Sequence, residues 1–426
     1  MASEKRDYDL VVFGATGDAG RAMATLLAEH AASRSKNNFR WTIAGRSEAK
    51  LEAIRSKAKL DAKPLLADCA DDAALRELAS RTRVLVSAAG PYHLLGERVL
   101  ASCIESKTHY VDITGEVPWV VEMKRKYNAA AVAAGVCIAS FCGYDCVPAE
   151  ISLFFGRQAL ASPLAFAESV LMPADGGGAP RGTLLTSLAL MHNVPSMMSG
   201  LANFVPPEQR WPMGLSLLTC LLPRWSSHVG GFTLPHFMFW CNTPIVHASS
   251  ACVGSPLAAG EDAGTTTTTL RYRDAMMLPL ADRWYTLWGL LPIVLIYLGL
   301  AVFGPLGWVL LAIPPVKSAA QSLLIGAYSY SGDRKATTVF RTAVAAPPAA
   351  ATIELKVPGD GGIFATALLA LACGYAMLDV LDDKGRGRRL KGGLCTPVEA
   401  LGDVLVSNLR SLPGVTLDVL EVKKGA

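Results

Sequence analysis

The sequence predicts an α/β protein in which a doubly wound parallel sheet comes first and a second domain follows. Three observations support this prediction. An apolar run ends in three spaced glycines between Leu10 and Gly20, and strand-like and helix-like segments then alternate up to Phe141. The chain has 426 residues, which is long enough for two domains with separate cores.

The first expected strand, Leu10 to Phe13, leads into Gly14-Ala-Thr-Gly17-Asp-Ala-Gly20, and a helical pattern follows from Arg21 to His30. Glycine lets the backbone turn tightly and approach a phosphate, and the N–H groups and positive dipole end of the helix then face the anion. This context favours a dinucleotide-binding strand–turn–helix over the alternative, an ordinary glycine turn in a βα unit.

Further strands and helices are expected in alternation. Ser47 is expected to cap a helix that runs through Ile54, with Glu48 in its first turn. Strands alternating with helices predict a parallel sheet covered on both faces, which binds ligands outside the carboxyl ends of its strands. The remaining strands are expected at 39–44, 63–68, 84–89, 109–113 and 136–141, and the remaining helices at 72–79, 97–106 and 120–134.

The end of the second strand indicates which dinucleotide binds. A carboxylate there bonds the ribose 2′-hydroxyl of NAD, whereas this chain has Ala44-Gly45-Arg46. A guanidinium suits a 2′-phosphate, so NADP(H) is favoured and NAD(H) stays open; alternatively, Arg46 is a solvated residue at a helix start. Asp68 is a candidate for the adenine region or for ordinary turn chemistry. The expected coenzyme-binding residues are Gly14, Thr16, Gly17, Gly20, Arg46, Asp68 and Gly90.

Composition narrows the class of partner. The formal net charge of +4 argues against nucleic acid as the main partner. The ten cysteines include no C-x-x-C pair and no zinc-type spacing, so we expect a reducing compartment and no metal. The charged N-terminus leads straight into the first strand, so no secretory signal is expected.

Residues 284–316 contain no charged side chain and contribute to the high mean hydropathy of +0.32. The stretch is longer than one straight bilayer crossing needs, and Trp284 and Trp288 lie at one end as an interfacial anchor would. Ordinary charged sequence flanks it on both sides, which favours a hairpin that enters and leaves the lipid on the same side. The alternative is a pair of buried core helices.

The second half gives a coarser prediction. Strands are expected at 165–171, 337–344 and 352–357, the last two antiparallel and joined by a flexible Ala-Ala-Pro-Pro-Ala-Ala link. Residues 195–250, rich in Met, Trp and Phe, suit an acyl-sized groove or plain packing equally well. Helices are expected at 365–381 and 397–409. We therefore divide the chain into a nucleotide-binding domain, 1–150, and a substrate and dimerisation domain, 151–426, with the apolar insert 284–316.

Taken together, the motifs resemble those of the saccharopine dehydrogenase-like oxidoreductases, a family that includes the trans-acting enoyl reductases of glycolipid synthesis. The matching segments are Gly14 to Gly20, 44–46, 90–92, 110–116, 143–148 and 392–397, so the resemblance spans nearly the whole chain. It implies a Rossmann-like domain followed by an α+β domain on an antiparallel sheet. For eukaryotic members it also implies association with lipid droplets or membranes, and we expect this chain at the cytoplasmic face of such a surface. The family usually has Ser where this chain has Cys146.

The apolar second half favours a lipid or acyl substrate. An amino-acid substrate such as saccharopine would need clustered cations, and Arg181 stands alone. The nicotinamide carries the hydride, so the protein need only position it and supply a proton. Two alternatives stay open: a nucleotide-binding scaffold on lipid surfaces without turnover, and a saccharopine-type dehydrogenase. A homodimer also stays open. The candidate catalytic residues are Tyr92, His93, Tyr144 and Asp145, with Glu116 behind them.

Overall fold

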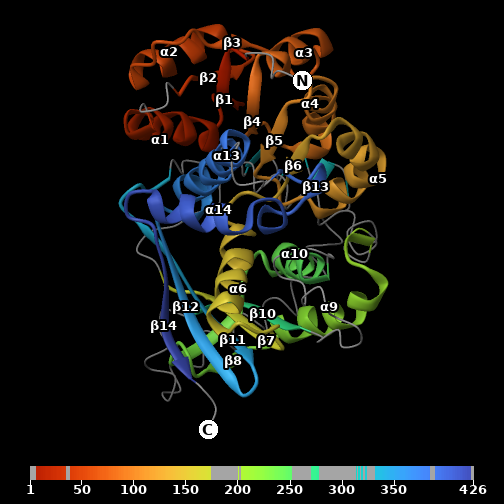
Figure 1. The fold of residues 1–426 in the computed structure, drawn as a ribbon, viewed down its shortest axis with the longest axis vertical. Coiled ribbons are helices and arrows are strands. Elements are labelled where there is room, and N and C mark those ends of the chain that lie inside the picture. Colours follow the sequence, from red (N-terminus) through yellow and green to blue (C-terminus); the bar gives the residue numbers. More distant parts are fainter. Residues whose placement is uncertain are drawn as a thin grey trace.

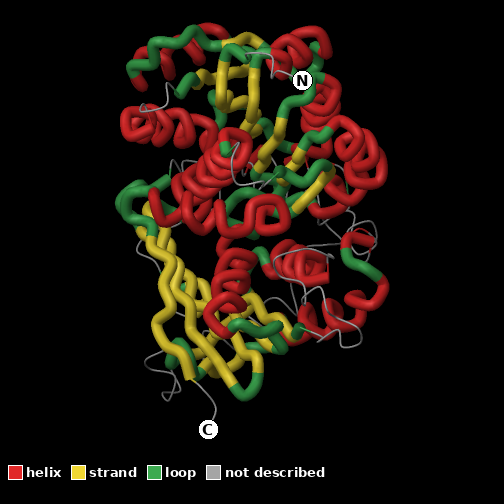
Figure 2. Tube along the Cα trace, viewed as in Figure 1, coloured by secondary structure: helices red, strands yellow, loops and turns green. Residues whose placement is uncertain are grey.

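The computed structural model describes residues 6–34, 39–173, 200, 203–251, 270–277, 332–383 and 389–423, with a few isolated positions between 313 and 323. The predicted hairpin 284–316 lies outside the described residues except for positions 313, 315 and 316, and Arg181 lies outside them too. Figures 1 and 2 show two parts stacked along the long axis, one with helices around a sheet and the other dominated by long strands.

The first sheet confirms the predicted doubly wound α/β fold. Its seven strands are all paired in parallel, in the order β13-β6-β5-β4-β1-β2-β3. Helices cover both of its faces (Figure 1). The strands are β1 (Tyr8–Phe13), β2 (Trp41–Gly45), β3 (Leu65–Leu66), β4 (Thr82–Ser87), β5 (His109–Asp112), β6 (Cys137–Ala139) and β13 (Gly393–Cys395).

Several helices of this part differ from prediction in where they begin or in how they are capped, and α1 and α5 each begin three residues earlier than expected. Ser47 is the N-cap residue of its helix, but its side chain makes no cap hydrogen bond. The fourth helix begins at Tyr92 rather than Glu97, because the distant carboxylate of Glu116 accepts the amides of its first turn. The helices are α1 (Asp18–Arg34), α2 (Glu48–Ala58), α3 (Asp72–Ser80), α4 (Tyr92–Glu105) and α5 (Val117–Ala134).

The second sheet is mixed, in the order β14-β12-β11-β7-β10-β9-β8, with only β7 and β10 parallel among its described pairs. The predicted flexible link is wrong: the alanines continue both strands, and Ala346 pairs with Ala349 around a tight turn. The strands are β7 (Phe166–Leu171), β8 (Arg224–Ser226), β9 (Gly231–Pro235), β10 (Arg271–Met277), β11 (Thr337–Ala346), β12 (Ala349–Pro358) and β14 (Thr416–Lys423). Helices α6 (Val147–Leu160), α9 (Pro207–Cys220) and α10 (Phe239–Ala251) belong to this half.

After β12 the chain returns to the first sheet, which the division at residue 150 did not anticipate. A π-helical turn, η3 (Gly361–Ala365), leads into α13 (Thr366–Asp382), and α14 (Pro397–Ser411) follows β13. Helix α13 packs against α1, α14 and β4. Together with η3 it forms the one described helix long and apolar enough to cross a membrane, and 89% of that window is buried in the protein. It is apolar all round because protein surrounds it.

Candidate functional site

The three glycines that follow β1 have different structural roles. Gly14 has φ of +78°, and a Cβ there would lie 2.8 Å from the Ala89 nitrogen. A Cβ on Gly20 would lie 2.2 Å from the Gly14 oxygen, so α1 touches the turn there. A Cβ on Gly17 would meet only the Gly14 oxygen within 4 Å of the described structure, at 3.5 Å. Gly14 and Gly20 are therefore needed by the fold, whereas Gly17 borders open space.

The amides of this turn show where an anion fits. Gly14 and Ala15 donate to the Ala44 oxygen at 3.0 and 3.2 Å, and Gly17 donates to Gly14 at 3.0 Å. The first bond inside the helix is donated by Arg21 to Gly17 at 2.8 Å. The helical residues before Arg21 have no acceptor within α1, and their N–H groups and the helix dipole favour a phosphate. The open side of Gly17 and these amides fit a dinucleotide pyrophosphate.

The two polar candidates at the next strand ends differ in role. The Asp68 carboxylate accepts the Ala70 amide at 2.9 Å, which is the turn chemistry that the sequence left as the alternative. Arg46 is exposed directly after β2. Burial and the nearby Asp68 charge raise the pKa of the Cys69 thiol, and the Arg46 charge lowers it, so both charged groups lie near that thiol. Arg46 thus stays available to a 2′-phosphate.

Tyr92 is built into the scaffold of the site. Its hydroxyl donates to the Ser87 oxygen at 2.8 Å and accepts the Ile113 amide at 3.3 Å. These bonds link the loops after β4 and β5, and burial raises the pKa of the phenol well above its usual value. A hydroxyl with both bonds inside the fold has no geometry for proton transfer to a substrate. We therefore regard Tyr92 as a positioning residue.

His93 and Glu116 form a pair at the start of α4. The Glu116 carboxylate accepts the amides of Tyr92 and His93, both at 2.9 Å, and lies 2.6 Å from the His93 Nδ1. A carboxylate there satisfies helix amides that would otherwise lack partners. The His93 ring is 39% exposed, so it lies at the rim rather than in the interior.

The buried polar centre lies after β6 and joins both halves of the chain. The Tyr144 hydroxyl lies 3.2 Å from the His236 Nε2, and the His236 Nδ1 lies 3.0 Å from an Asp274 oxygen. Asn242 donates to the same Asp274 oxygen at 2.7 Å. We call Tyr144, His236 and Asp274 the buried relay. The hydrogen bonds are consistent with a phenol donating to Nε2 and Nδ1–H donating to the carboxylate.

Apolar packing fixes the relay in place. The Tyr144 ring packs near Phe340 and stacks on Phe237, with centroids 5.4 and 6.1 Å apart. A Cβ on Gly361 would come within 2.5 Å of the same ring. All three relay residues are buried, and the second Asp274 oxygen has no hydrogen-bond donor among the described residues. Such a buried network is rigid.

Two carboxyl groups, one at the end of β5 and one in the loop after β6, have raised pKa values. Burial raises the pKa of Asp145 to about 6, with the His236 charge lowering it and the Asp274 charge raising it. Asp145 is half-buried, and its oxygen would lie 3.4 Å from a Cβ on Gly115, in the loop after β5. Burial also raises the pKa of Asp112 to about 7, but its oxygens accept bonds from the loops after β5 and β6. Asp145 can exchange protons near neutral pH, and Asp112 ties loops together.

Sequence reasoning selected Tyr144 and Asp145 but missed His236 and Asp274. The missed residues lie in a loop before α10 and inside β10, outside any motif. A lone histidine and an aspartate within a strand give no local signal. An acidic residue in a strand that pairs on both sides was the available hint, because a buried carboxylate needs a partner.

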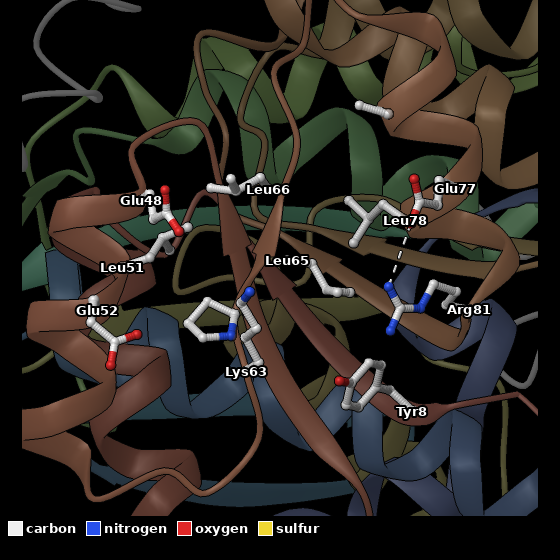
Figure 3. Close-up of a pocket in the computed structure, with 12 residues that line it drawn as sticks. Tyr8, Glu48, Leu51, Glu52, Lys63, Leu65, Leu66, Glu77, Leu78 and Arg81 are labelled. Atoms are coloured by element: carbon white, nitrogen blue, oxygen red, sulfur yellow. Dashed lines mark hydrogen bonds and ion pairs between the residues drawn. The ribbon is translucent and has the colours of Figure 1, made fainter.

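A separate hollow of about 320 Å³ lies over the edge strand β3, between α2 and α3 (Figure 3). Its rim carries both charge signs, and the Arg81 guanidinium is paired there with Glu77. The hollow does not include the glycine turn or the relay, and we assign no ligand to it. Among the described residues, no group of three His, Cys, Asp or Glu could hold a metal ion.

Comparison with known proteins supports the assignment of a coenzyme site to the glycine turn. Residues 10–138 match the family model described as the saccharopine dehydrogenase NADP binding domain, so this domain binds NADP. The chain is 34% identical over 186 residues to the human saccharopine dehydrogenase-like oxidoreductase, covering 41% of this chain and 43% of the relative. It is 35% identical over 176 residues to a lipid droplet localized protein of Caenorhabditis elegans, covering 40% and 41%. These alignments span about two fifths of the relatives' length.

Two comparisons extend over the whole chain. A putative trans-acting enoyl reductase of Mycobacterium tuberculosis is 27% identical over 439 residues, covering 98% of both chains. Apo saccharopine dehydrogenase (L-Glu forming) from Saccharomyces cerevisiae superposes with a TM-score of 0.52 at 13% identity, covering 98% of this chain and 100% of that one. The second similarity shows the fold alone.

Proposed function

We propose that the chain is a member of the saccharopine dehydrogenase-like oxidoreductases and acts as an NADP(H)-dependent oxidoreductase on a lipid or acyl substrate at a membrane or lipid-droplet surface. The observation that carries the proposal is the presence of two features at one sheet edge. The glycine turn fits a pyrophosphate, and Tyr144, the first residue of the buried relay, lies in the loop after β6, where a group that moves a proton is useful.

The nicotinamide, when bound, supplies or accepts the hydride. The protein's part is to hold the coenzyme and to move one proton. Gly17 and the first amides of α1 would hold the pyrophosphate, and Arg46 the 2′-phosphate. When His236 is protonated, its Nε2–H donates to the Tyr144 oxygen, and the phenol proton is then directed to a substrate anion. The Nε2 proton replaces the proton that the phenol gives up, and Asp274 stabilises the imidazolium.

The buried charges of the second half support an apolar substrate. Arg273 is the large cation buried in the sheet, and its guanidinium donates to Glu168 at 2.5 Å and Thr233 at 2.7 Å. Its remaining nitrogens donate to the carbonyls of Thr219 and Leu222. This cation is fully paired, so it offers nothing to a substrate carboxylate. The names of two relatives, a lipid droplet localized protein and a putative trans-acting enoyl reductase, point to lipid chemistry as well.

The first test is coenzyme binding. Titrating the protein with NADPH and NADH, followed by coenzyme fluorescence, is expected to show tighter binding of NADPH. Arg46→Ala is expected to remove that preference and leave NADH binding unchanged, because only the 2′-phosphate loses its partner. Failure to bind either coenzyme would remove the enzyme hypothesis.

The second test separates an enzyme from a scaffold. NADPH oxidation is measured with a panel of α,β-unsaturated acyl thioesters and lipids and with carboxylate-rich amino-acid imines. Tyr144→Phe is expected to lower the rate at least about a hundredfold, since it removes a general acid. Tyr127→Phe is the matched control, because that hydroxyl only bonds Glu97 near the surface. Coenzyme binding without turnover of any panel member would favour the scaffold, and turnover of the imines would favour a saccharopine-type dehydrogenase.

A further inference from the structure

Helix α9 is oriented with polar side chains toward the protein. Gln209 and Ser216 are buried on its inner side, with Met213 and Cys220. The buried ring of His247 holds both polar groups: Nδ1 lies 3.3 Å from the Gln209 oxygen, and Nε2 lies 3.0 Å from the Ser216 hydroxyl. Burial lowers the pKa of His247 to about 4, so the ring is neutral and can bridge a donor and an acceptor.

This orientation turns the apolar side of α9 to the outside. Its exposed side chains follow a spacing of four, three and four residues, which places them on one helix face. They are Trp211 (75% exposed), Leu215 (42%), Leu218 (58%) and, just past the helix end, Leu222 (58%). Leu221 and Trp225, which follow α9 in the chain, are exposed as well. We call these six residues the α9 face.

The hydrogen bonds of His247 explain why the helix cannot rotate its leucines inward. Such a rotation would bury the leucines but would leave His247, Gln209 and Ser216 without partners inside the protein. The Tyr272 amide, in β10, would lose its acceptor as well, since it donates to Ser216 at 3.1 Å. The outward apolar face is therefore a consequence of the packed interior. A contiguous exposed apolar surface of this kind marks an interaction site.

From this geometry we infer that the α9 face is a docking surface for an anionic phospholipid surface. Indole rings suit the boundary between headgroups and acyl chains, and Trp211 and Trp225 are the first and last residues of this set in the sequence. Exposed arginines, Arg210 and Arg224, are their neighbours in the chain. Arg224 lies 4.0 Å from a Glu168 oxygen but is half exposed, so both arginines can approach lipid phosphates. In Figure 1, α9 lies at the outer side of its half, away from the first sheet.

The inference deepens the proposed function, because an enzyme of lipid-surface substrates needs a face that docks there. The two remain separable by experiment. Docking is read from vesicle binding and coenzyme use from NADPH titration, so either can fail alone.

The experiment uses the full chain and vesicles of phosphatidylcholine with and without phosphatidylserine. Wild-type protein is expected to co-sediment with the phosphatidylserine vesicles, and less so at high salt. The double variant Leu215→Glu/Leu218→Glu is expected to bind at least about tenfold more weakly, because two leucines no longer leave water. Leu420→Glu, a similarly exposed leucine on β14, is the matched control and is expected to bind as wild type.

Two further measurements distinguish a loss of vesicle binding from a folding defect. Each variant is expected to retain its NADPH affinity and its unfolding temperature, since the replaced side chains are exposed. Vesicles with bromine-labelled acyl chains are expected to quench wild-type tryptophan fluorescence, and Trp211→Phe is expected to remove part of that quenching. Vesicle binding by the double variant equal to wild type would overturn the inference. The inference would also be overturned if wild-type protein bound no vesicles and the double variant lost dimer formation or thermal stability. The α9 face would then be covered by protein.

Discussion

Replacing Gly17 and Gly20 separately by alanine distinguishes coenzyme binding from folding at the same turn. At Gly17 the new methyl would have the Gly14 oxygen at 3.5 Å, an ordinary contact, and the backbone needs no left-handed conformation. Gly17 caps α1 through its carbonyl, and alanine is a poorer cap than glycine, so we expect a stability loss of at most about 1 kcal/mol. The methyl would, however, occupy the open space where a pyrophosphate approaches.

At Gly20, by contrast, an added methyl is expected to destabilise the fold. The methyl would lie 2.2 Å from the Gly14 oxygen, 2.8 Å from the Ala15 Cα and 2.9 Å from the Gly14 carbonyl carbon. All three are backbone atoms, so α1 must move away from the turn. Overpacking of this kind costs about 1–3 kcal/mol or more. We expect Gly20→Ala to lower the unfolding temperature by several degrees.

The assays are NADPH titration by fluorescence and thermal unfolding by circular dichroism. The Gly17→Ala methyl would hold the pyrophosphate away from the first amides of α1. Losing one charge-assisted hydrogen bond in this way costs about 1.5–3 kcal/mol, so NADPH binding is expected to weaken by about ten- to a hundredfold at nearly unchanged stability. Gly214→Ala, in a helix with open space around the glycine, is the control for a methyl added elsewhere. The reasoning is refuted if Gly17→Ala binds NADPH as tightly as wild type, or if Gly20→Ala is as stable as wild type.

Three further predictions concern carboxyl groups. Burial raises the pKa of Glu150 to about 7, so the contribution of its protonated form to stability is present at low pH and is lost as the pH rises through about 7. The unfolding temperature should therefore rise when the pH is lowered from 8 to 5. Glu150→Gln should flatten that rise. Burial raises the pKa of Glu168, but hydrogen bonds from His228 and Ser226 and the Arg273 charge lower it by more, so that the net pKa is about 2. The ionised Glu168 therefore stabilises the fold, and this contribution is lost as the pH falls below about 4.5. Glu168→Gln should cost about 3–5 kcal/mol in urea unfolding, because it leaves the Arg273 charge buried without its partner. Glu116→Ala should speed hydrogen exchange of the first amides of α4, and protection equal to wild type would contradict the capping role.

The relay marks one limit of sequence reasoning. Tyr144 and His236 are 92 residues apart, and His236 and Asp274 are 38 apart. Each residue alone has an ordinary setting: a tyrosine after a strand, a histidine before a helix, an aspartate in a strand. Only the packing of the second sheet against the loops of the first brings them within hydrogen-bond distance. Tyr92 shows the converse, since a well-placed candidate proves to have its hydroxyl bonded inside the fold.

The return of the chain to the first sheet after β12 is a second feature that the sequence did not predict. The sequence shows 365–381 as an apolar helix, but no pattern says which core it fills. The structure places α13 against α1 and β4 and adds β13 beside β6. A helix without a polar side needs protein on every side, and it finds this between the two halves of the chain.

The sequence by itself predicted the parallel sheet, the glycine turn and a coenzyme that carries a 2′-phosphate. These depend on spacings of a few residues, and backbone geometry converts such spacings directly into local structure. Only the tertiary structure decided that Tyr144 meets His236 and Asp274, and that α9 faces outward with its leucines. Both depend on buried polar groups finding partners far away in the chain, and the cost of leaving such groups unpaired fixes arrangements that local periodicity cannot specify.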